Sequence, residues 1–157
     1  MSLDEVIYYI KNKKKIPKRT FVVTFDDGFE NNYSIAAPIL NDLKIPATFY
    51  FSTDFVENNT MSWIDKIEYC FEKDKKQKKF QINQLGNHDI SSIKKKIKTL
   101  NIIRKKIKSD FNINIDEITS KVFNYFKIKE INKSNDDLDK KINWSKVKLL
   151  NSNELFT

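Results

Sequence analysis

The chain has 157 residues, which is enough for one domain with a sizeable core, and its 39% hydrophobic and 13% aromatic content excludes a disordered chain. The formal net charge is +8, but arginine, whose planar fork suits phosphate recognition, is rare among the basic residues. We therefore expect no direct binding to nucleic acid. The single cysteine, Cys70, excludes an internal disulfide and a cysteine-rich zinc site, and we expect it to be a small core residue.

The first predicted element is a short helix at the N-terminus. Ser2 is a helix N-cap, and Glu5 three positions later completes a capping box. This acidic start lacks the basic and apolar stretches of a signal peptide, and no apolar run reaches membrane-spanning length. As written, the chain has no export signal, so we expect a cytoplasmic or envelope-associated protein.

A βαβ unit follows. Residues 20–25 are β-branched and aromatic almost throughout, which predicts a strand buried on both faces. Residues 31–44 predict a helix that packs Leu40 and Leu43 against the sheet, and residues 47–51 predict a second buried strand. Because the connections are short, the two strands should be parallel, which places the chain in the α/β class.

From about Trp63 onward the pattern is mostly helical and much more charged. Helices are predicted at 63–73, 91–108, 116–127 and 144–150, and a short edge strand at 80–85. We expect Asn143 to be the N-cap of the last helix. In the second of these helices, lysines lie opposite an apolar stripe of Ile93, Ile97, Leu100, Ile103 and Ile107.

Two adjacent carboxylates stand at the carboxyl end of the first predicted strand. Asp26 and Asp27 follow it directly, and Gly28 permits a sharp turn that can direct both side chains into one cleft. Two adjacent carboxylates in a partly dry site repel each other when both are ionised. They coexist when one of them is protonated or a cation lies beside them. Such a pair could divide the binding of a divalent metal and the removal of a proton from water. The alternative is a simple turn with an Asx hydrogen bond.

The sequence resembles the polysaccharide deacetylases (carbohydrate esterase family 4, the chitin and peptidoglycan deacetylases). Residues 22–29, Val-Val-Thr-Phe-Asp-Asp-Gly-Phe, resemble the first motif of that family. Residues 37–40 and 45–50 are similar to its next helix and strand, and residues 63–68 to members with a helical insertion. The convincing part of the resemblance covers residues 3–70.

The resemblance implies a fold, a reaction and roles for two residues. The fold would be a partial irregular (β/α) barrel: residues 1–60 would form its N-terminal part, 61–141 a lysine-rich helical insertion, and 142–157 a return to the barrel. The reaction would be hydrolysis of N-acetyl groups on an N-acetylated polysaccharide or a glycolipid-linked sugar. Asp26 would be the general base and Asp27 a ligand of a divalent metal, with zinc as the expected ion.

The chain departs from the family at its second motif. A His-x-x-x-His pair that would supply two more ligands is missing, and the single histidine, His88, is expected to cap or precede the 91–108 helix. Catalytic zinc usually has three protein ligands, so whether this chain alone binds metal stays open. Since Thr157 lies about where that motif should begin, we expect an N-terminal fragment that is inactive by itself.

Two other classes of function remain as alternatives. The chain could be a non-catalytic remnant or binding module with the same fold, or a basic protein that binds nucleic acid or an anionic surface. Within the insertion, two roles are open: a wall of the substrate groove, or contact with an anionic envelope surface through Lys94, Lys95, Lys98, Lys105 and Lys108. A merely solvated lysine-rich face is the third interpretation.

Overall fold

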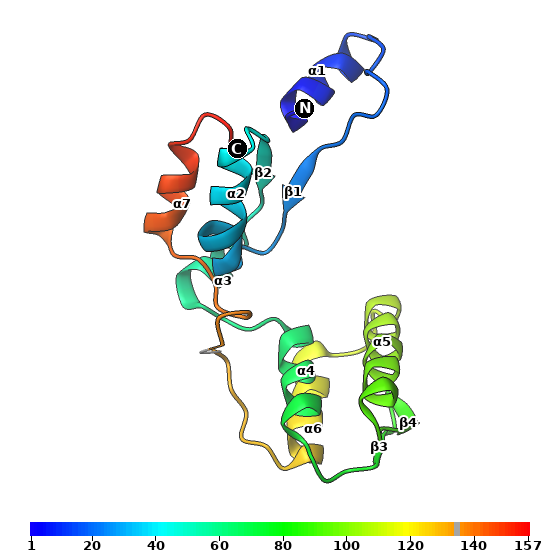
Figure 1. The fold of residues 1–157 in the computed structure, drawn as a ribbon. Helices are drawn as coiled ribbons and strands as arrows, with labels where there is room; N and C mark the ends of the chain where they lie inside the picture. Colours follow the sequence, from blue (N-terminus) through cyan, green and yellow to red (C-terminus); the bar gives the residue numbers. More distant parts are fainter. Residues whose placement is uncertain (134–135) are drawn as a thin grey trace. The chain divides into compact units, whose positions relative to one another are not determined.

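A computed structural model describes residues 1–133 and 136–157 of this mixed α/β chain (Figure 1). The chain forms two compact units. The first comprises residues 1–60 and 133–157, the second comprises residues 61–132, and each has its own hydrophobic core. Among the described residues the sheets are small and none closes into a barrel. In the same residues, no helix combines the length and apolar character needed to cross a membrane.

The first unit begins with helix α1 (Leu3–Lys11), which starts as predicted. The backbone N–H of Glu5 donates to the Ser2 hydroxyl at 3.1 Å, and the Ser2 N–H donates to the Glu5 carboxylate at 2.7 Å. This reciprocal pair is the predicted capping box, and it satisfies two N–H groups that lack partners within the helix. None of the residues in α1 is buried.

A parallel sheet forms the centre of the first unit. Strand β1 (Val23–Phe25) pairs with β2 (Ala47–Phe49), with Val23 opposite Ala47 and Phe25 opposite Phe49. This confirms the predicted parallel pair. The last residues of the chain extend the sheet on the other side of β2. Ala47 donates to the carbonyl of Leu155 at 3.0 Å and accepts from Thr157 at 3.1 Å, which is a parallel bridge pattern.

Strand β1 is shorter and more exposed than predicted. Only residues 23–25 of the predicted 20–25 form a strand, Phe21 is 66% exposed, and Thr24 faces solvent. The prediction of burial on both faces was wrong, because only the face that carries Val23 and Phe25 packs against the core. In contrast, all three residues of β2 are buried.

The predicted helix over 31–44 consists of a π-helical turn η1 (Asn32–Ala36) followed by α2 (Ala37–Asp42). The change of helix type falls between Ala36 and Ala37, and Pro38 lies in the first turn of α2, where its missing N–H is tolerated. Leu40 packs against the core as predicted. Leu43 does not: it lies after the end of α2 and is 63% exposed.

Aromatic rings link β1, β2 and the bridged segment at residues 155–157. Phe25 stacks on Phe49 with ring centroids 5.0 Å apart, and Phe49 meets Phe156 edge to face at 5.3 Å. Helix α7 (Trp144–Asn151), with Asn143 as its predicted N-cap, lies beside α2 (Figure 1). Helix α3 (Thr53–Asn58), which the sequence pattern did not indicate, adds Val56 to the core.

The second unit is mainly helical. Its elements are α4 (Trp63–Lys73), the antiparallel strands β3 (Lys79–Ile82) and β4 (Gly86–Asp89), α5 (Ile93–Ser109) and α6 (Ile115–Phe126). Its core contains Phe71, Phe80 and Phe126, whose ring centroids lie 5.0 to 5.7 Å apart. Cys70 is fully buried in the same core, as predicted.

Two features of this unit differ from the sequence-based expectation. The predicted edge strand is one arm of a β-hairpin, and its partner β4 contains His88 opposite Phe80, so His88 precedes α5, as expected, but does not cap it. In α5, Ile103 and Ile107 are buried, but Ile93 is 79% and Ile97 is 54% exposed. The apolar stripe of α5 is therefore covered only toward its C-terminal half.

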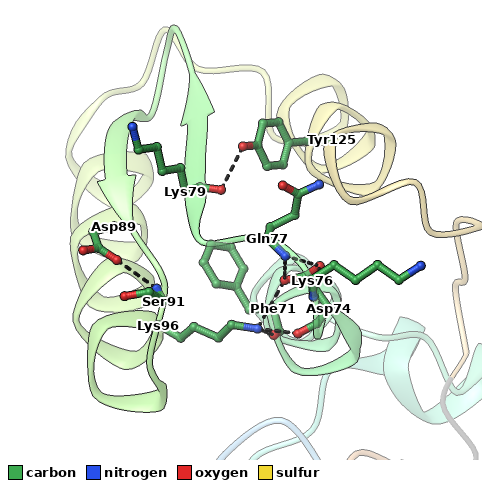
Figure 2. Close-up of polar contacts among 9 residues, drawn as sticks. All are labelled: Phe71, Asp74, Lys76, Gln77, Lys79, Asp89, Ser91, Lys96 and Tyr125. Atoms are coloured by element: carbon green, nitrogen blue, oxygen red, sulfur yellow. Dashed lines mark hydrogen bonds and ion pairs between the residues drawn. The ribbon is translucent and has the colours of Figure 1, made fainter.

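A lysine side chain, that of Lys96, hydrogen-bonds to carbonyl groups at the C-terminal end of α4 (Figure 2). The Lys96 ammonium group donates to the carbonyl of Phe71 at 2.7 Å and to the carbonyl of Asp74, and it lies 3.4 Å from the Asp74 carboxylate. The same carboxylate accepts the backbone N–H groups of Lys76 and Gln77 at 3.2 Å. A positive group therefore lies at the negative end of the helix dipole.

The chain enters and leaves the second unit at neighbouring positions. The N–H of Met61 donates to the carbonyl of Asn132 at 2.8 Å within this unit. One residue outward on each side, Thr60 and Lys133 form an antiparallel bridge within the first unit.

Candidate active site

Asp26 and Asp27 lie at the carboxyl end of β1, directly after the last strand residue. The N–H of Tyr50, just past the end of β2, donates to the carbonyl of Phe25 at 2.8 Å, so the two strands end side by side. Both aspartates are exposed. The carboxyl edge of a parallel sheet is where α/β proteins place ligand and catalytic groups, and two carboxylates are available at that edge here.

The backbone leaves β1 through a tight turn. The N–H of Gly28 donates to the carbonyl of Asp26 at 2.9 Å, two residues back along the chain. Asp27 has φ of 66° and Gly28 has φ of 69°, so two successive residues adopt left-handed conformations. For a non-glycine residue that conformation is strained by about 1–3 kcal/mol. The turn breaks the strand alternation that would otherwise send the two neighbouring carboxylates to opposite faces.

Gly28 is buried against two core side chains, and a larger residue would not fit there. A Cβ atom on Gly28 would lie 2.9 Å from a ring carbon of Phe51 and 3.3 Å from a methyl carbon of Ile142. The carbonyl of Gly28 accepts the N–H of Ile142 at 2.9 Å. Residue 28 must therefore be glycine for two independent reasons, its positive φ and its close contacts.

A strap formed by residues 140–142 holds the Asp-Asp-Gly turn in place. Besides the bond from Ile142, the N–H of Glu30 donates to the carbonyl of Lys140 at 2.8 Å, and Phe29 pairs with Lys141 in an antiparallel bridge. These bonds join residues more than a hundred positions apart in the sequence. The strap fixes the backbone on the C-terminal side of the two aspartates.

Lys141 is the residue of this site that sequence reasoning missed. Only 4% of it is exposed, and its ammonium group lies 3.4 Å from the ring centroid of Phe29 and 5.0 Å from that of Phe55. Its backbone N–H donates to the side-chain oxygen of Asn59 at 2.8 Å. In the sequence it is one of many lysines, and only a contact with residues far away along the chain distinguishes it.

A second basic residue joins α7 to the start of the η1 helix. Lys146 forms an ion pair with Glu30, whose side chain is 13% exposed, and the Lys146 ammonium group lies 5.4 Å from the ring centroid of Tyr33. An ion pair with one largely buried partner restricts both side chains. The segment after the aspartates is therefore held by backbone bonds and by a charge pair.

The described residues do not form a metal site by themselves. Nowhere among residues 1–133 and 136–157 do three or more histidine, cysteine, aspartate or glutamate side chains gather as ligands of one ion. Asp26 and Asp27 contribute two carboxylates. His88 belongs to the other unit, where its Nε2 atom lies 2.9 Å from the carbonyl of Leu85 and its ring stacks on Phe80. A catalytic zinc site usually needs three protein ligands, so these residues alone do not fit one.

A family model described as polysaccharide deacetylase matches residues 13–151, a range that includes the Asp-Asp-Gly turn and the strap. The chain belongs to the polysaccharide deacetylase family. Three poly-β-1,6-N-acetyl-D-glucosamine N-deacetylases, from Staphylococcus aureus strains MSSA476, MRSA252 and N315, are each 42% identical to this chain over 67 residues. That stretch is 43% of this chain and 23% of each relative, so the match spans less than a quarter of their length. No solved structure matches.

Proposed function

We propose that this chain is part of a metal-dependent deacetylase that hydrolyses N-acetyl groups on a polymer of N-acetylated sugars. Family membership and the named activity of the Staphylococcus aureus relatives support the reaction class. The single observation that carries the site is the strained Asp26-Asp27-Gly28 turn at the carboxyl edge of the parallel sheet. A glycolipid-linked N-acetylated sugar has the same acetamide group and is the alternative substrate.

In this proposal the two aspartates have different roles. Asp26 is the general base and takes a proton from the water molecule that attacks the acetamide carbonyl. Asp27 would supply one carboxylate to a divalent metal, with zinc as the expected ion, and such a site would need further ligands besides the two aspartates. The turn supports this division, because its two positive φ values allow both carboxylates to leave the alternating pattern of the strand.

The architecture follows the same proposal. The parallel β1, β2 and 155–157 segments are a portion of an irregular (β/α) barrel. Residues 1–60 form its N-terminal part, residues 61–141 are a lysine-rich insertion, and residues 142–157 return to the barrel.

The test uses the full-length protein encoded with this chain. Acetate release is measured on oligomers of β-1,6-linked N-acetylglucosamine and on chito-oligosaccharides, with zinc or cobalt added. Asp26→Asn should lower kcat by about 10²–10⁴-fold while the bound metal stays at one equivalent. Asp27→Ala should lose both the activity and the metal.

The outcomes separate the proposal from its alternative. Loss of metal from the Asp26 variant and retention by the Asp27 variant would reverse the two roles. A full-length protein with neither bound metal nor acetate release would favour the non-catalytic remnant.

A further inference from the structure

The net charge of the chain lies entirely in one of its two units. Residues 61–132 contain 17 lysines and arginines and 9 aspartates and glutamates, which gives +8. The remaining residues contain 12 of each sign, which gives zero. A lysine-rich composition shared by the whole chain does not explain this division, because the first unit balances its basic residues with acids and the second does not.

Part of the excess charge forms a stripe on α5. Its solvent-facing side carries four exposed lysines at spacings of four, seven and three residues, which place them on one face of the helix: Lys94, Lys98, Lys105 and Lys108. The stripe is about 21 Å long at 1.5 Å per residue. The opposite side of α5 is buried through Thr99, Ile103 and Ile107.

Three other basic residues of α5 have ion-pair partners, but those of the stripe do not. Lys95 pairs with Asp89 at 2.7 Å, Lys96 with Asp74 at 3.4 Å, and Arg104 with Glu68. The four stripe lysines make no ion pair within the part of the chain that the structure describes. The sequence pattern grouped Lys95 with the stripe lysines, but Lys95 forms an ion pair and is therefore not part of the stripe.

The stripe lowers the stability of the helix that carries it. Like charges three or four residues apart repel one another. The first turn of α5 contains Lys94 and no acid, although the N-terminal end of a helix favours negative charge. Lys108 lies in the last turn, where a positive charge is favoured, but helix stability does not account for the rest of the stripe.

Exposed apolar side chains lie within this basic surface. Ile93 and Ile97 line a groove of about 710 Å³, and Lys75, Lys76 and Lys78 line the same groove from the loop after α4, in which Figure 2 shows Lys76. On α5, the two isoleucines stand next to the stripe lysines along the helix. Three acids also line the groove, of which Glu68 and Asp74 are paired and Glu72 is exposed.

We propose that the second unit docks on an anionic lipid bilayer through this surface. We call it the lysine–isoleucine face; it consists of Ile93, Ile97, the four stripe lysines and the three loop lysines. The lysines contact lipid phosphates, and the two isoleucines enter the headgroup region. Basic residues around exposed apolar side chains are the pattern that binds such an interface. Compact lysine charges rather than arginine forks, together with the isoleucines, favour a lipid surface over nucleic acid. This inference does not depend on the deacetylase proposal.

The test measures co-sedimentation of the 157-residue chain with vesicles made of equal parts phosphatidylglycerol and phosphatidylcholine. We expect binding at about 0.1 M salt and loss of binding at about 1 M salt or with phosphatidylcholine alone. The variant Lys94→Glu/Lys98→Glu/Lys105→Glu/Lys108→Glu should lower the partition coefficient by about a hundredfold or more. Ile93→Ser/Ile97→Ser keeps every charge and should lower it by about tenfold.

A matched control removes the effect of net charge. The variant Lys11→Glu/Lys13→Glu/Lys15→Glu/Lys18→Glu changes four exposed lysines of the first unit and reaches the same net charge of zero. It should lower the partition coefficient by less than about threefold, because it leaves every residue of the lysine–isoleucine face unchanged. Circular dichroism spectra that superimpose on that of the parent chain establish that each variant is folded.

Three results would overturn the proposal. Equal loss of binding in the two four-lysine variants would mean that only net charge matters. Unchanged vesicle binding by the isoleucine variant, with full competition by inorganic polyphosphate, would identify a site for soluble polyanions. Tighter binding to double-stranded DNA than to the vesicles at about 0.1 M salt would identify a nucleic-acid surface.

Discussion

The ammonium group of Lys141 lies 3.4 Å from the ring centroid of Phe29, the residue that follows the Asp-Asp-Gly turn. Both residues also pair through their backbones. A charged side chain inside a small hydrophobic core is stable only when its surroundings offset the lost hydration. Lys141 therefore contributes to the stability of the first unit and also holds the residue that follows the Asp-Asp-Gly turn.

Lys141→Ala should lower the free energy of unfolding of the first unit by about 1–3 kcal/mol, since it removes a buried cation and its ring contacts. The measurement is urea unfolding followed by Trp144 fluorescence in a Trp63→Phe background, which leaves one tryptophan in the first unit. Lys140→Ala is the matched control at an exposed neighbour and should change the value by less than about 0.5 kcal/mol. Equal effects of the two substitutions would contradict a special role for Lys141.

Substitutions at Asp27 and Gly28, the two residues with positive φ, should change the free energy of unfolding in opposite directions. Asp27→Gly relieves a positive φ in a side-chain-bearing residue and should stabilise the first unit by about 1 kcal/mol. Gly28→Ala adds a Cβ atom 2.9 Å from Phe51 and should destabilise it by about 1–3 kcal/mol. The same Trp144 unfolding curves measure both. Destabilisation by Asp27→Gly would contradict this expectation. It would show that the Asp27 carboxylate stabilises the fold by more than its positive φ costs.

Lys96→Met should destabilise the second unit by about 1–3 kcal/mol, because it leaves the carbonyls of Phe71 and Asp74 and the Asp74 carboxylate without their shared donor. Trp63 fluorescence in a Trp144→Phe background reports on this unit. Lys98→Met, an identical change on the exposed side of the same helix, should be neutral or slightly stabilising. A similar loss for both variants would mean that removing any lysine weakens α5.

Burial, and secondly the charge of Glu130, raise the pKa of the Cys70 thiol from 9.0 to about 12. The native thiol thus stays protonated when an unfolded one would ionise. Its contribution to stability is complete below about pH 9 and decreases as the pH rises from 9 to 12. At pH 8, labelling by a thiol reagent should be about 10³-fold slower than in urea, since the buried thiol reacts only after opening. Val122→Ala, a core change in the same unit, should speed labelling, whereas Lys141→Ala should not.

The 157-residue chain by itself should release no acetate from acetylated chito-oligosaccharides, with or without added zinc or cobalt. The physical reason is that Asp26 and Asp27 have no third ligand beside them among the described residues. The assay is run with a full-length relative as the positive control. Turnover that Asp26→Asn abolishes would mean that the chain obtains its missing ligands in another way, for example from a second copy.

Local signals predicted much of the fold. The capping box of Ser2 and Glu5 marked the start of α1, and the β-branched run before Asp26 with the short connection to β2 predicted the parallel pair. The position of the aspartates at the end of β1 followed from the same pattern. These features depend on residues within a few positions of one another, so the sequence displays them directly.

Contacts between distant segments were not predictable in this way. The strap at residues 140–142 and the bridge from Ala47 to Phe156 join residues about a hundred positions apart. Strand β4, Gly-Asn-His-Asp, has little intrinsic strand preference and forms because β3 pairs with it. Likewise, periodicity showed that α5 has an apolar stripe but not that Ile93 and Ile97 would remain exposed, because that depends on how far the neighbouring elements extend.

The paired entrance and exit of the second unit have a consequence for how such a chain can vary. Thr60 and Lys133 already sit opposite each other as bridge partners, so a tight turn of two to four residues could join them directly. The parallel strands, the Asp-Asp-Gly turn and the strap would all be retained in the shortened chain. A module attached through such a hairpin junction can be exchanged, enlarged or lost by a single insertion or deletion event, and the surface it presents can change independently of the Asp-Asp-Gly turn.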